Sequence, residues 1–337
     1  MNILENISLK GLNTFGIDVL ASRYVEINSV SALEEILSDE KLKGEKKLIL
    51  GGGSNVLFTK NFDGLVMHVS LKGISFQDAG DHVFCKAAAG EVWHDVVMKS
   101  LELGLYGLEN LSLIPGSVGA APIQNIGAYG VELKDIFHQL EAFHLEDKVI
   151  KVFDREECAF GYRDSCFKRE QKGKWMILSV TMKLSKQGIV KTSYGAIQEV
   201  LAEQKIVDAG PREVSNAVIS IRKSKLPDPK DLGNAGSFFK NPEIPKELYQ
   251  KLTVEWPDMP SYPATPSLVK IPAAYLIEKC NWKGKQIGNV GSHSKQPLVL
   301  VNYGGASGEE VKQLAFEIID SVFLKFGVRL EPEVNFV

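Results

Sequence analysis

The chain has 337 residues, with 39 basic and 42 acidic side chains and a formal net charge of −3. Since domains average about 150 residues, this length predicts two of them. With 44% hydrophobic and 24% charged residues, the composition is typical of a globular protein and excludes wholesale disorder. The slightly acidic balance, without a basic tail, gives no support to a nucleic-acid partner.

The N-terminal residues and the longest uncharged segment bear on localisation. Glu5 and Lys10 interrupt the stretch where a signal peptide needs an apolar core. The uncharged run 110–131 contains prolines and several glycines, which argues against a membrane-spanning helix. No metal-ligand spacing is present among the four scattered cysteines, Cys85, Cys158, Cys166 and Cys280. We therefore expect a cytoplasmic protein with reduced thiols, no structural zinc and no membrane partner.

In the first half of the chain, short apolar strands alternate with occasional helices. We expect strands at residues 23–27, 47–50, 64–70 and 82–89. We expect helices at residues 31–37 and 92–103. The second of these helices ends at Gly104, because glycine readily adopts the left-handed conformation of a helix C-cap.

The second half continues with a similar mixture. The apolar patterns predict strands at residues 139–144, 149–153, 176–184, 297–302 and 328–337. They predict helices at residues 213–225, 272–280 and 311–326, the last from an apolar stripe of helical period. Because few regular βαβ spacings occur, the order of elements favours an α+β fold over a doubly wound sheet.

A glycine-rich turn, Gly51-Gly52-Gly53-Ser54-Asn55, follows the predicted strand 47–50. Glycines after a strand let backbone N–H groups converge on a phosphate, because no Cβ blocks the approach. The turn lacks the GxGxxG of a Rossmann fold and the Lys-Ser/Thr of a P-loop. Taken alone, it is equally compatible with a tight turn that binds nothing.

A second segment, residues 107–130, has Glu109 as its only charged residue and is rich in small residues. So many small side chains mean that its backbone lies close to another segment or to a ligand. Its backbone donors suit the flat edge and the pyrophosphate of a flavin. A close-packed crossing in the core is the alternative. We favour the ligand, because a long irregular segment without one would leave many backbone groups to satisfy.

Several further side chains are dispersed along the chain and are weak signals individually. The simplest interpretation of Tyr194 is a half-buried aromatic ring. The simplest interpretation of Arg163 is a surface residue in a salt bridge. Ser237 would be a turn hydroxyl, and Glu333, two residues after Glu331 on a predicted strand, would belong to a solvated acidic edge. His94, which follows Trp93, is by default a packed helix residue.

Taken together, these segments resemble a known family. The motifs NTFG, GGGSN, GLENLSLIPGSVGAAPIQNIGAYGVEL, FGYRDS, KLPDPK, GNAGSFFKNP and LEPEV follow one another in fixed order. They resemble the UDP-N-acetylenolpyruvoylglucosamine reductases, also called UDP-N-acetylmuramate dehydrogenases, from about Asn13 to Val334. The segment around Tyr194 is similar to a subclass with a tyrosine-bearing loop over the substrate.

The resemblance implies a particular domain organisation. Residues 1–205 would form an FAD-binding domain of the vanillyl-alcohol-oxidase/PCMH type, with lobes at about 1–70 and 71–205. Residues 206–337 would form a smaller α+β substrate-binding domain whose C-terminal strand returns to the active site. FAD would be held noncovalently, although some proteins of this fold tether it through histidine or cysteine.

The resemblance also implies a reaction. NADPH would reduce UDP-N-acetyl-3-O-(1-carboxyvinyl)-glucosamine to UDP-N-acetylmuramate through FAD, in peptidoglycan precursor synthesis. Arg163 and Glu333 would stabilise the anion that develops on the enolpyruvyl carboxylate, and Glu333 must then carry or share a proton. Ser237 would protonate the adjacent carbon as a general acid.

Positions that match the family's binding residues fall into two sets. The cofactor set is Gly51, Gly52, Gly53, Ser54, Asn55, Pro115, Gly116, Ser117, Gly119, Ala120, Ile126, Gly127, Tyr129 and Arg222. The substrate set, which includes cations and donors for the diphosphate, is Tyr194, Lys225, Asn241, Lys283 and Gln296. There are two departures from the family pattern. Asn335 stands where an arginine is usual, and Gly52 where many relatives have an acidic residue.

Two other functions stay open from the sequence. One is an FAD oxidase of the same fold with another substrate, and the other is a UDP-sugar-binding protein without redox activity. The trio Arg163, Ser237 and Glu333 speaks against the second, because a binding protein needs no such set. We expect a monomer.

Overall fold

The computed structural model describes residues 2–337, and these form two compact units. The first comprises residues 2–7, 21–53 and 62–224, and the second comprises residues 8–20, 54–61 and 225–337. The chain therefore crosses from one unit to the other several times. Among the described residues, no helix is both long and apolar enough to cross a membrane.

The N-terminal part of the first unit is a four-stranded sheet in the order β1-β2-β5-β3. Its strands are β1 (Leu4–Ser8), β2 (Leu20–Ile27), β5 (Phe62–Val69) and β3 (Lys47–Leu50). β5 pairs in parallel with both β2 and β3. Helix α1 (Val30–Ser38) begins where the Ser29 hydroxyl accepts the Ala32 N–H, and it buries Leu33 and Ile36 in the core of the unit.

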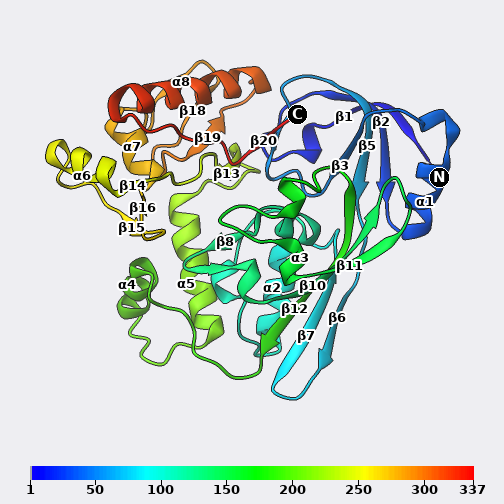
Figure 1. Ribbon diagram of the computed structural model, residues 1–337, viewed down its shortest axis with the longest axis horizontal. Helices are drawn as coiled ribbons and strands as arrows, with labels where there is room; N and C mark the ends of the chain where they lie inside the picture. Colours follow the sequence, from blue (N-terminus) through cyan, green and yellow to red (C-terminus); the bar gives the residue numbers. More distant parts are fainter. Residues whose placement is uncertain (1) are drawn as a thin grey trace. The chain divides into compact units, whose positions relative to one another are not determined.

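The rest of the first unit is built on a five-stranded antiparallel sheet in the order β11-β10-β12-β7-β6 (Figure 1). Its strands are β6 (Ile74–Asp78), β7 (His82–Ala88), β10 (Phe137–His144), β11 (Ile150–Asp154) and β12 (Trp175–Ser185). The central strand β12 is buried over most of its length because it has neighbours on both edges. Helix α2 (Trp93–Glu102) adds Trp93, Val96 and Val97 to the same core. Gly104, at φ +68°, ends it as predicted.

Two further helices, α4 (Gly195–Glu203) and α5 (Pro211–Lys225), share a small apolar core within the first unit. Ile197 and Leu201 of α4 pack with Val214 and Val218 of α5. This packing places the division of the structure after Ser224, whereas the sequence predicted a boundary after residue 205. The second unit also takes in two N-terminal segments that the prediction assigned to the FAD-binding domain.

The second unit contains an antiparallel sheet in the order β13-β19-β18-β17. Its strands are β13 (Gly233–Ser237), β17 (Gln286–Ile287), β18 (Val290–Ser292) and β19 (Val299–Asn302). The long helix α8 (Gly308–Phe326) lies along β18 and β19 (Figure 1), and α7 (Ala273–Lys279) contacts α8. A smaller sheet, β14-β16-β15, carries α6 (Lys246–Glu255), and its strands are Glu243–Pro245, Leu268–Lys270 and Tyr262–Pro263.

The end of the chain differs from the prediction. A strand was expected over residues 328–337, but only β20 (Asn335–Phe336) is one, paired in parallel with β4 (Val56–Leu57). Pro332 lacks an N–H and so interrupts a ladder, and it forms only an isolated bridge with Phe239. The other predicted elements occur within a few residues of their expected bounds, and the mixture of elements confirms the α+β class.

Candidate active site

In the first unit, the two glycine-rich loops touch at their backbones. An ideal Cβ added to Gly52 would lie 3.1 Å from the Gly116 Cα and 3.4 Å from the Ser117 nitrogen. An ideal Cβ on Gly51 would lie 2.4 Å from the Ser117 Oγ. These glycines therefore let two stretches of main chain lie against one another. Such a surface of small residues fits the backbone-donor cradle that a pyrophosphate requires.

The second loop is fastened to the segment that enters helix α2. Going along the loop, the Leu111 carbonyl accepts the Trp93 indole N–H at 2.9 Å, and the Gly116 carbonyl accepts the Trp93 backbone N–H at 3.0 Å. The N–H groups of Val118 and Gly119 then donate to the carbonyls of residues 91 and 89. The loop thus has a fixed position on the core of the first unit.

Arg163 lies in a turn that Asn125 ties to the second glycine-rich segment. Asn125 is fully buried, with φ +44°. Its side-chain amide donates to the Gly161 carbonyl at 2.9 Å and to the Glu132 carboxylate at 3.1 Å, and its oxygen accepts the Lys134 N–H at 2.9 Å. One side chain therefore joins the loop that contains Gly127 to the turn that contains Arg163.

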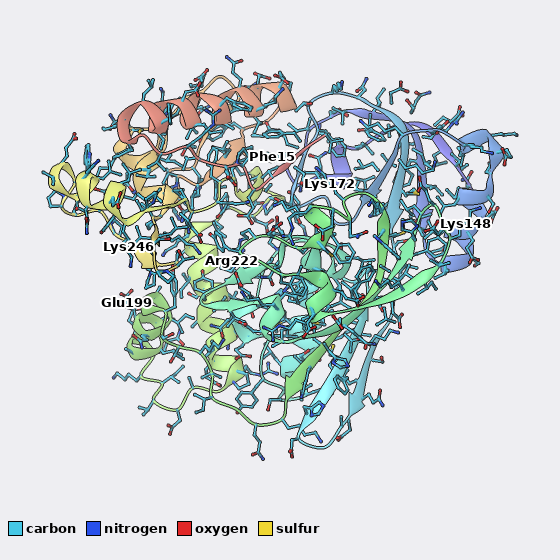
Figure 2. All side chains as sticks on the ribbon, in the orientation of Figure 1. Phe15, Lys148, Lys172, Glu199, Arg222 and Lys246 are labelled. Atoms are coloured by element: carbon cyan, nitrogen blue, oxygen red, sulfur yellow. The ribbon has the colours of Figure 1, made fainter. Side chains whose placement is uncertain are left out.

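Arg163 belongs to a cluster of cationic and aromatic side chains in the first unit. Its guanidinium donates to the Gly127 carbonyl at 2.6 Å. Burial lowers the pKa of Arg222, labelled on α5 in Figure 2, and the positive charge of Arg163 lowers it further. The Tyr129 hydroxyl hydrogen-bonds Arg222, and the Tyr129 ring meets that of Tyr194 edge-on at 5.2 Å. Two guanidinium groups in one cluster favour an anion beside them.

Ser237 stands at the end of β13 in the second unit, beyond an irregularity in the β13–β19 pairing. Gly236 adopts φ +70°, and its N–H donates to the Asn234 side chain at 2.9 Å. The Asn234 amide in turn donates to the Leu232 carbonyl at 2.8 Å. This arrangement turns the chain before Ser237, while Phe238, next in sequence, is buried.

Glu333 lies on a segment adjacent to that of Ser237. Its N–H donates to the carbonyl of Phe238 at 2.7 Å, and its carbonyl accepts the Asn55 side-chain amide at 3.2 Å. Ser237, the last residue of β13, and Glu333 are thus brought onto adjacent segments of one unit. Glu331, in contrast, pairs with Lys240 at 3.2 Å and forms the solvated acidic edge.

Asn335 anchors the GGGSN turn. Both its N–H and its side-chain amide donate to the Asn55 carbonyl, at 3.1 Å and 3.0 Å. The backbone of Asn55 is therefore held to the segment that carries Glu333.

The predicted substrate-binding residues of the second unit have mainly local partners. Asn241 accepts the Ala273 N–H at 2.9 Å, at the start of α7. Lys283 pairs with Glu278 at 2.8 Å, and the Gln296 carbonyl accepts the Val299 N–H at 3.0 Å. Lys225 is an exposed cation at the start of the second unit.

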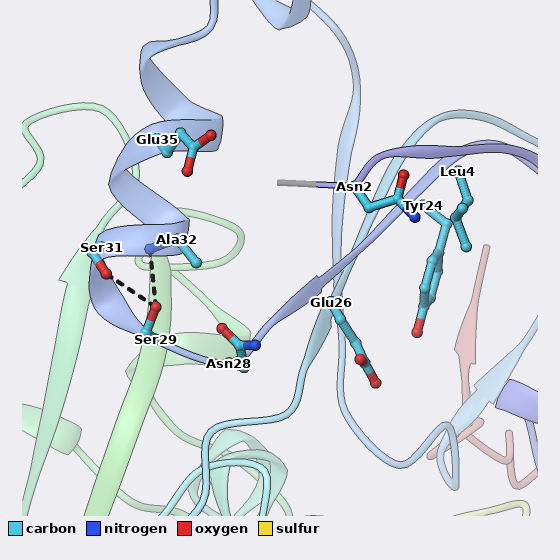
Figure 3. A pocket seen from close by; sticks show the side chains of 9 residues that line it. All are labelled: Asn2, Leu4, Tyr24, Glu26, Asn28, Ser29, Ser31, Ala32 and Glu35. Atoms are coloured by element: carbon cyan, nitrogen blue, oxygen red, sulfur yellow. Dashed lines mark hydrogen bonds between the residues drawn. The ribbon is translucent and has the colours of Figure 1, made fainter.

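A cavity of about 490 Å³ lies in the first unit between β1, β2 and α1 (Figure 3). Its lining includes Tyr24, Glu26, Ser29 and Glu35, and none of the predicted site residues is among the described residues that line it. Residues 2–337 contain no cluster of three or more His, Cys, Asp or Glu side chains that could hold a metal ion. All four cysteines are free thiols.

The sequence assigned no role in the site to three residues that shape it: His94, which was interpreted as a packed helix residue, Asn125 and Asn234. The His94 Nδ1 accepts the Leu113 N–H at 3.0 Å, and Arg222 donates to the Leu113 carbonyl at 3.2 Å. For Asn125, its place among the small residues of the second segment was the only available signal. His94 and Asn234 gave none, because their partners were not visible in the sequence.

Comparisons with known proteins give the class to which this chain belongs. Residues 21–152 match a family model described as an FAD binding domain. Residues 228–337 match one described as the C-terminal domain of UDP-N-acetylenolpyruvoylglucosamine reductase. The α+β fold and the glycine-rich cradle, together with these matches, define an FAD-dependent oxidoreductase.

Similar curated proteins give the family. The chain is 49% identical to the UDP-N-acetylenolpyruvoylglucosamine reductase of Amoebophilus asiaticus, with 100% of both chains covered. It is 48% identical to that of Flavobacterium johnsoniae over 100% of both chains, and 46% identical to that of Pseudomonas aeruginosa over 99% of both. The chain belongs to the family of UDP-N-acetylenolpyruvoylglucosamine reductases.

A solved structure supports the fold. The UDP-N-acetylenolpyruvylglucosamine reductase from Thermus caldophilus superimposes with a TM-score of 0.67 at 22% identity, covering 99% of this chain and 98% of that one. The family resemblance and the FAD cofactor predicted from the sequence are therefore confirmed.

Proposed function

We propose that this chain reduces UDP-N-acetyl-3-O-(1-carboxyvinyl)-glucosamine to UDP-N-acetylmuramate, with NADPH as hydride donor and FAD as cofactor, in peptidoglycan precursor synthesis. Full-length similarity to curated reductases supports this activity. The observation that supports it best in the structure is that the Arg163 and Arg222 guanidinium groups both donate to the second glycine-rich segment, at the carbonyls of Gly127 and Leu113. A cationic site at such a loop suits a substrate with a carboxylate and a diphosphate.

In this proposal, FAD is held noncovalently by residues 51–55 and 115–127, with Tyr129 and Arg222. When bound, FAD supplies hydride transfer from NADPH to the enolpyruvyl substrate. Residues 51–55 and 115–127 contain no charged side chain, so these loops hold the cofactor through backbone N–H groups and neutral polar side chains.

A first prediction concerns the contact between the two loops. In the variant Gly52→Ala, the added Cβ would meet the Gly116 backbone at 3.1 Å, so the loops must move apart. Overpacking of this kind costs about 1–3 kcal/mol, so we expect FAD binding to weaken roughly tenfold or more. Titration of the FAD-free protein with FAD, followed by quenching of flavin fluorescence, measures the effect.

Gly11→Ala is the matched control, because no atom lies within 4 Å of its added Cβ and its φ is not left-handed. This variant should bind FAD like the wild type. Equal FAD affinity for the two alanine variants would show that the loop contact does not support the cofactor.

Ser237, Glu333 and Arg163 are proposed to carry the chemistry on the substrate. The Arg163 guanidinium stabilises the negative charge that develops on the enolpyruvyl carboxylate. Glu333, in its protonated form, donates a hydrogen bond to the same anion. The Ser237 hydroxyl gives its proton to the carbon next to the one that receives the hydride.

The substrate diphosphate and the rest of the nucleotide sugar are assigned to Tyr194, Lys225, Asn241 and Lys283, with Gln296 near the reacting end. The two lysines supply charge and the other residues supply hydrogen-bond donors. Because NADPH and nucleotide sugars are cytoplasmic metabolites, we place the enzyme in the cytoplasm. We propose that it acts as a monomer, without nucleic-acid or membrane partners.

A second prediction concerns noncovalent binding of FAD, which the proposed function requires. Purified protein should be yellow, and acid precipitation should release all the flavin into the supernatant as FAD, because no covalent bond holds it. Absorption spectra of the pellet and supernatant measure the distribution. Colourless protein that takes up no added FAD would refute the proposed function, and flavin retained in the pellet would refute noncovalent binding.

A further inference from the structure

Leu113, in the second glycine-rich segment, has a strained backbone that two side chains hold in place. Its φ is +58°, a left-handed conformation that is unfavourable for leucine. Its N–H donates to the His94 Nδ1 at 3.0 Å, and its carbonyl accepts from the Arg222 Nε at 3.2 Å. Both backbone polar groups of Leu113 are thus satisfied by side chains, one from α2 and one from α5.

Leu113 lies in the part of the second glycine-rich segment that precedes the proposed cofactor-binding residues. The backbone is fixed on one side at Leu111, by the Trp93 indole, and on the other at Gly116, by the Trp93 N–H. Leu113 stands between these points, and Gly116 is the residue whose Cα faces Gly52. Holding Leu113 therefore defines the path by which the chain enters the contact between the loops.

Of the groups that hold this loop on the α2 side, His94 is the one that titrates near neutral pH. Its Nδ1 can accept the Leu113 N–H only when the imidazole is neutral, because both ring nitrogens are donors in the protonated form. Burial lowers the pKa of His94 below the ordinary value of 6.5. Of the charged neighbours, Asp95 on the same helix opposes this shift, whereas Arg222 and Lys223 on α5 reinforce it.

We propose that His94 is a positioning residue that makes FAD binding depend on pH through its hydrogen bond to Leu113. The proposal rests on the proposed function, since it requires FAD at this loop. This hydrogen bond forms only when His94 is neutral. Protonation of the imidazole therefore breaks it and releases the Leu113 N–H. FAD affinity is then full above the pKa of His94 and falls as pH decreases through it.

The test measures the dissociation constant of FAD by fluorescence titration of the FAD-free protein from about pH 8 to about pH 5. For the wild type we expect a loss of about tenfold toward the acidic end, the scale for a buried donor left without its acceptor. His94→Asn places an amide oxygen near the Nδ1 position and does not titrate. This variant should bind FAD with near-normal affinity at neutral pH and without the acidic loss.

Two further variants complete the experiment. His94→Phe removes the acceptor, so it should bind FAD about tenfold more weakly even at neutral pH. His138→Asn changes an exposed histidine on β10 and should keep the wild-type pH profile. If His94→Phe does not fold, the comparison between wild type and His94→Asn still decides the question.

The inference is overturned if His94→Asn keeps the acidic loss of the wild type, or if the wild type shows no such loss. It is also overturned if folded His94→Phe binds FAD as tightly as the wild type. Protein that binds no FAD at any pH would instead refute the proposed function, so the two failures are distinguishable.

Discussion

Ser237→Ala is expected to lose the second half of the reaction while keeping the first. Reduction of bound FAD by NADPH needs no proton from this hydroxyl and should proceed at close to the normal rate. Reoxidation by the enolpyruvyl substrate does need it, and should slow by about 10²–10⁴-fold, the range for loss of a general acid. Stopped-flow absorbance of the flavin under anaerobic conditions separates the two halves.

Ser237→Cys is the matched variant, because it keeps a transferable proton at the same place. It should recover part of the lost reoxidation rate. Although serine is a weak acid, the chain presents its hydroxyl through the turn at Gly236, which the Asn234 side chain fixes. Position can therefore outweigh acidity. Equal impairment of both half-reactions, or of neither, would make Ser237 a structural turn residue.

Glu333→Gln is expected to slow turnover by about 10²–10³-fold, the usual effect of removing one preorganised group that stabilises a developing anion. The amide keeps the shape of the side chain, but its N–H is a far weaker acid than a carboxyl O–H and therefore stabilises the developing anion much less. FAD reduction by NADPH should stay nearly intact, which steady-state turnover and single-turnover reduction together establish.

Glu331→Gln is the control for this variant. Glu331 lies two residues earlier and pairs with Lys240 at the surface of the same unit. Exposed pairs contribute little, so this variant should retain near-normal turnover and stability. The assignment of Glu333 fails if its variant turns over normally, or if Glu331→Gln shows the larger defect.

The elements that the sequence predicted best are those with a strong apolar pattern. β12 is buried along most of its length, and α8 buries a continuous stripe from Val311 to Phe326. Helix α6 was not predicted, since it has no fully buried residue and hence no stripe to detect. The terminal strand was overestimated because its apolar residues outweighed the missing donor of Pro332.

In the candidate site, too, the features that depend on neighbouring residues could be predicted from the sequence, and those that depend on distant residues could not. The glycine-rich loops could be recognised because each is a continuous run of small residues in the sequence. The connection of Asn125 to Gly161 could not, because it joins residues 36 positions apart. The link between His94 and Leu113 spans 19 positions, and a histidine after a tryptophan gives no sign of it. The roles of Arg163, Ser237 and Glu333 came from family resemblance, since residue spacing alone assigns no chemistry to them.

The most direct test of the proposed activity is the fate of the substrate. Purified enzyme is incubated with NADPH and UDP-N-acetyl-3-O-(1-carboxyvinyl)-glucosamine under anaerobic conditions, and the nucleotide sugar is analysed by mass spectrometry. We predict a product heavier by two hydrogen atoms, UDP-N-acetylmuramate, formed with the consumption of one NADPH. An unchanged nucleotide sugar would contradict the account. In that case, peroxide formation on admission of oxygen would indicate an oxidase, and binding without reaction would indicate a UDP-sugar-binding protein.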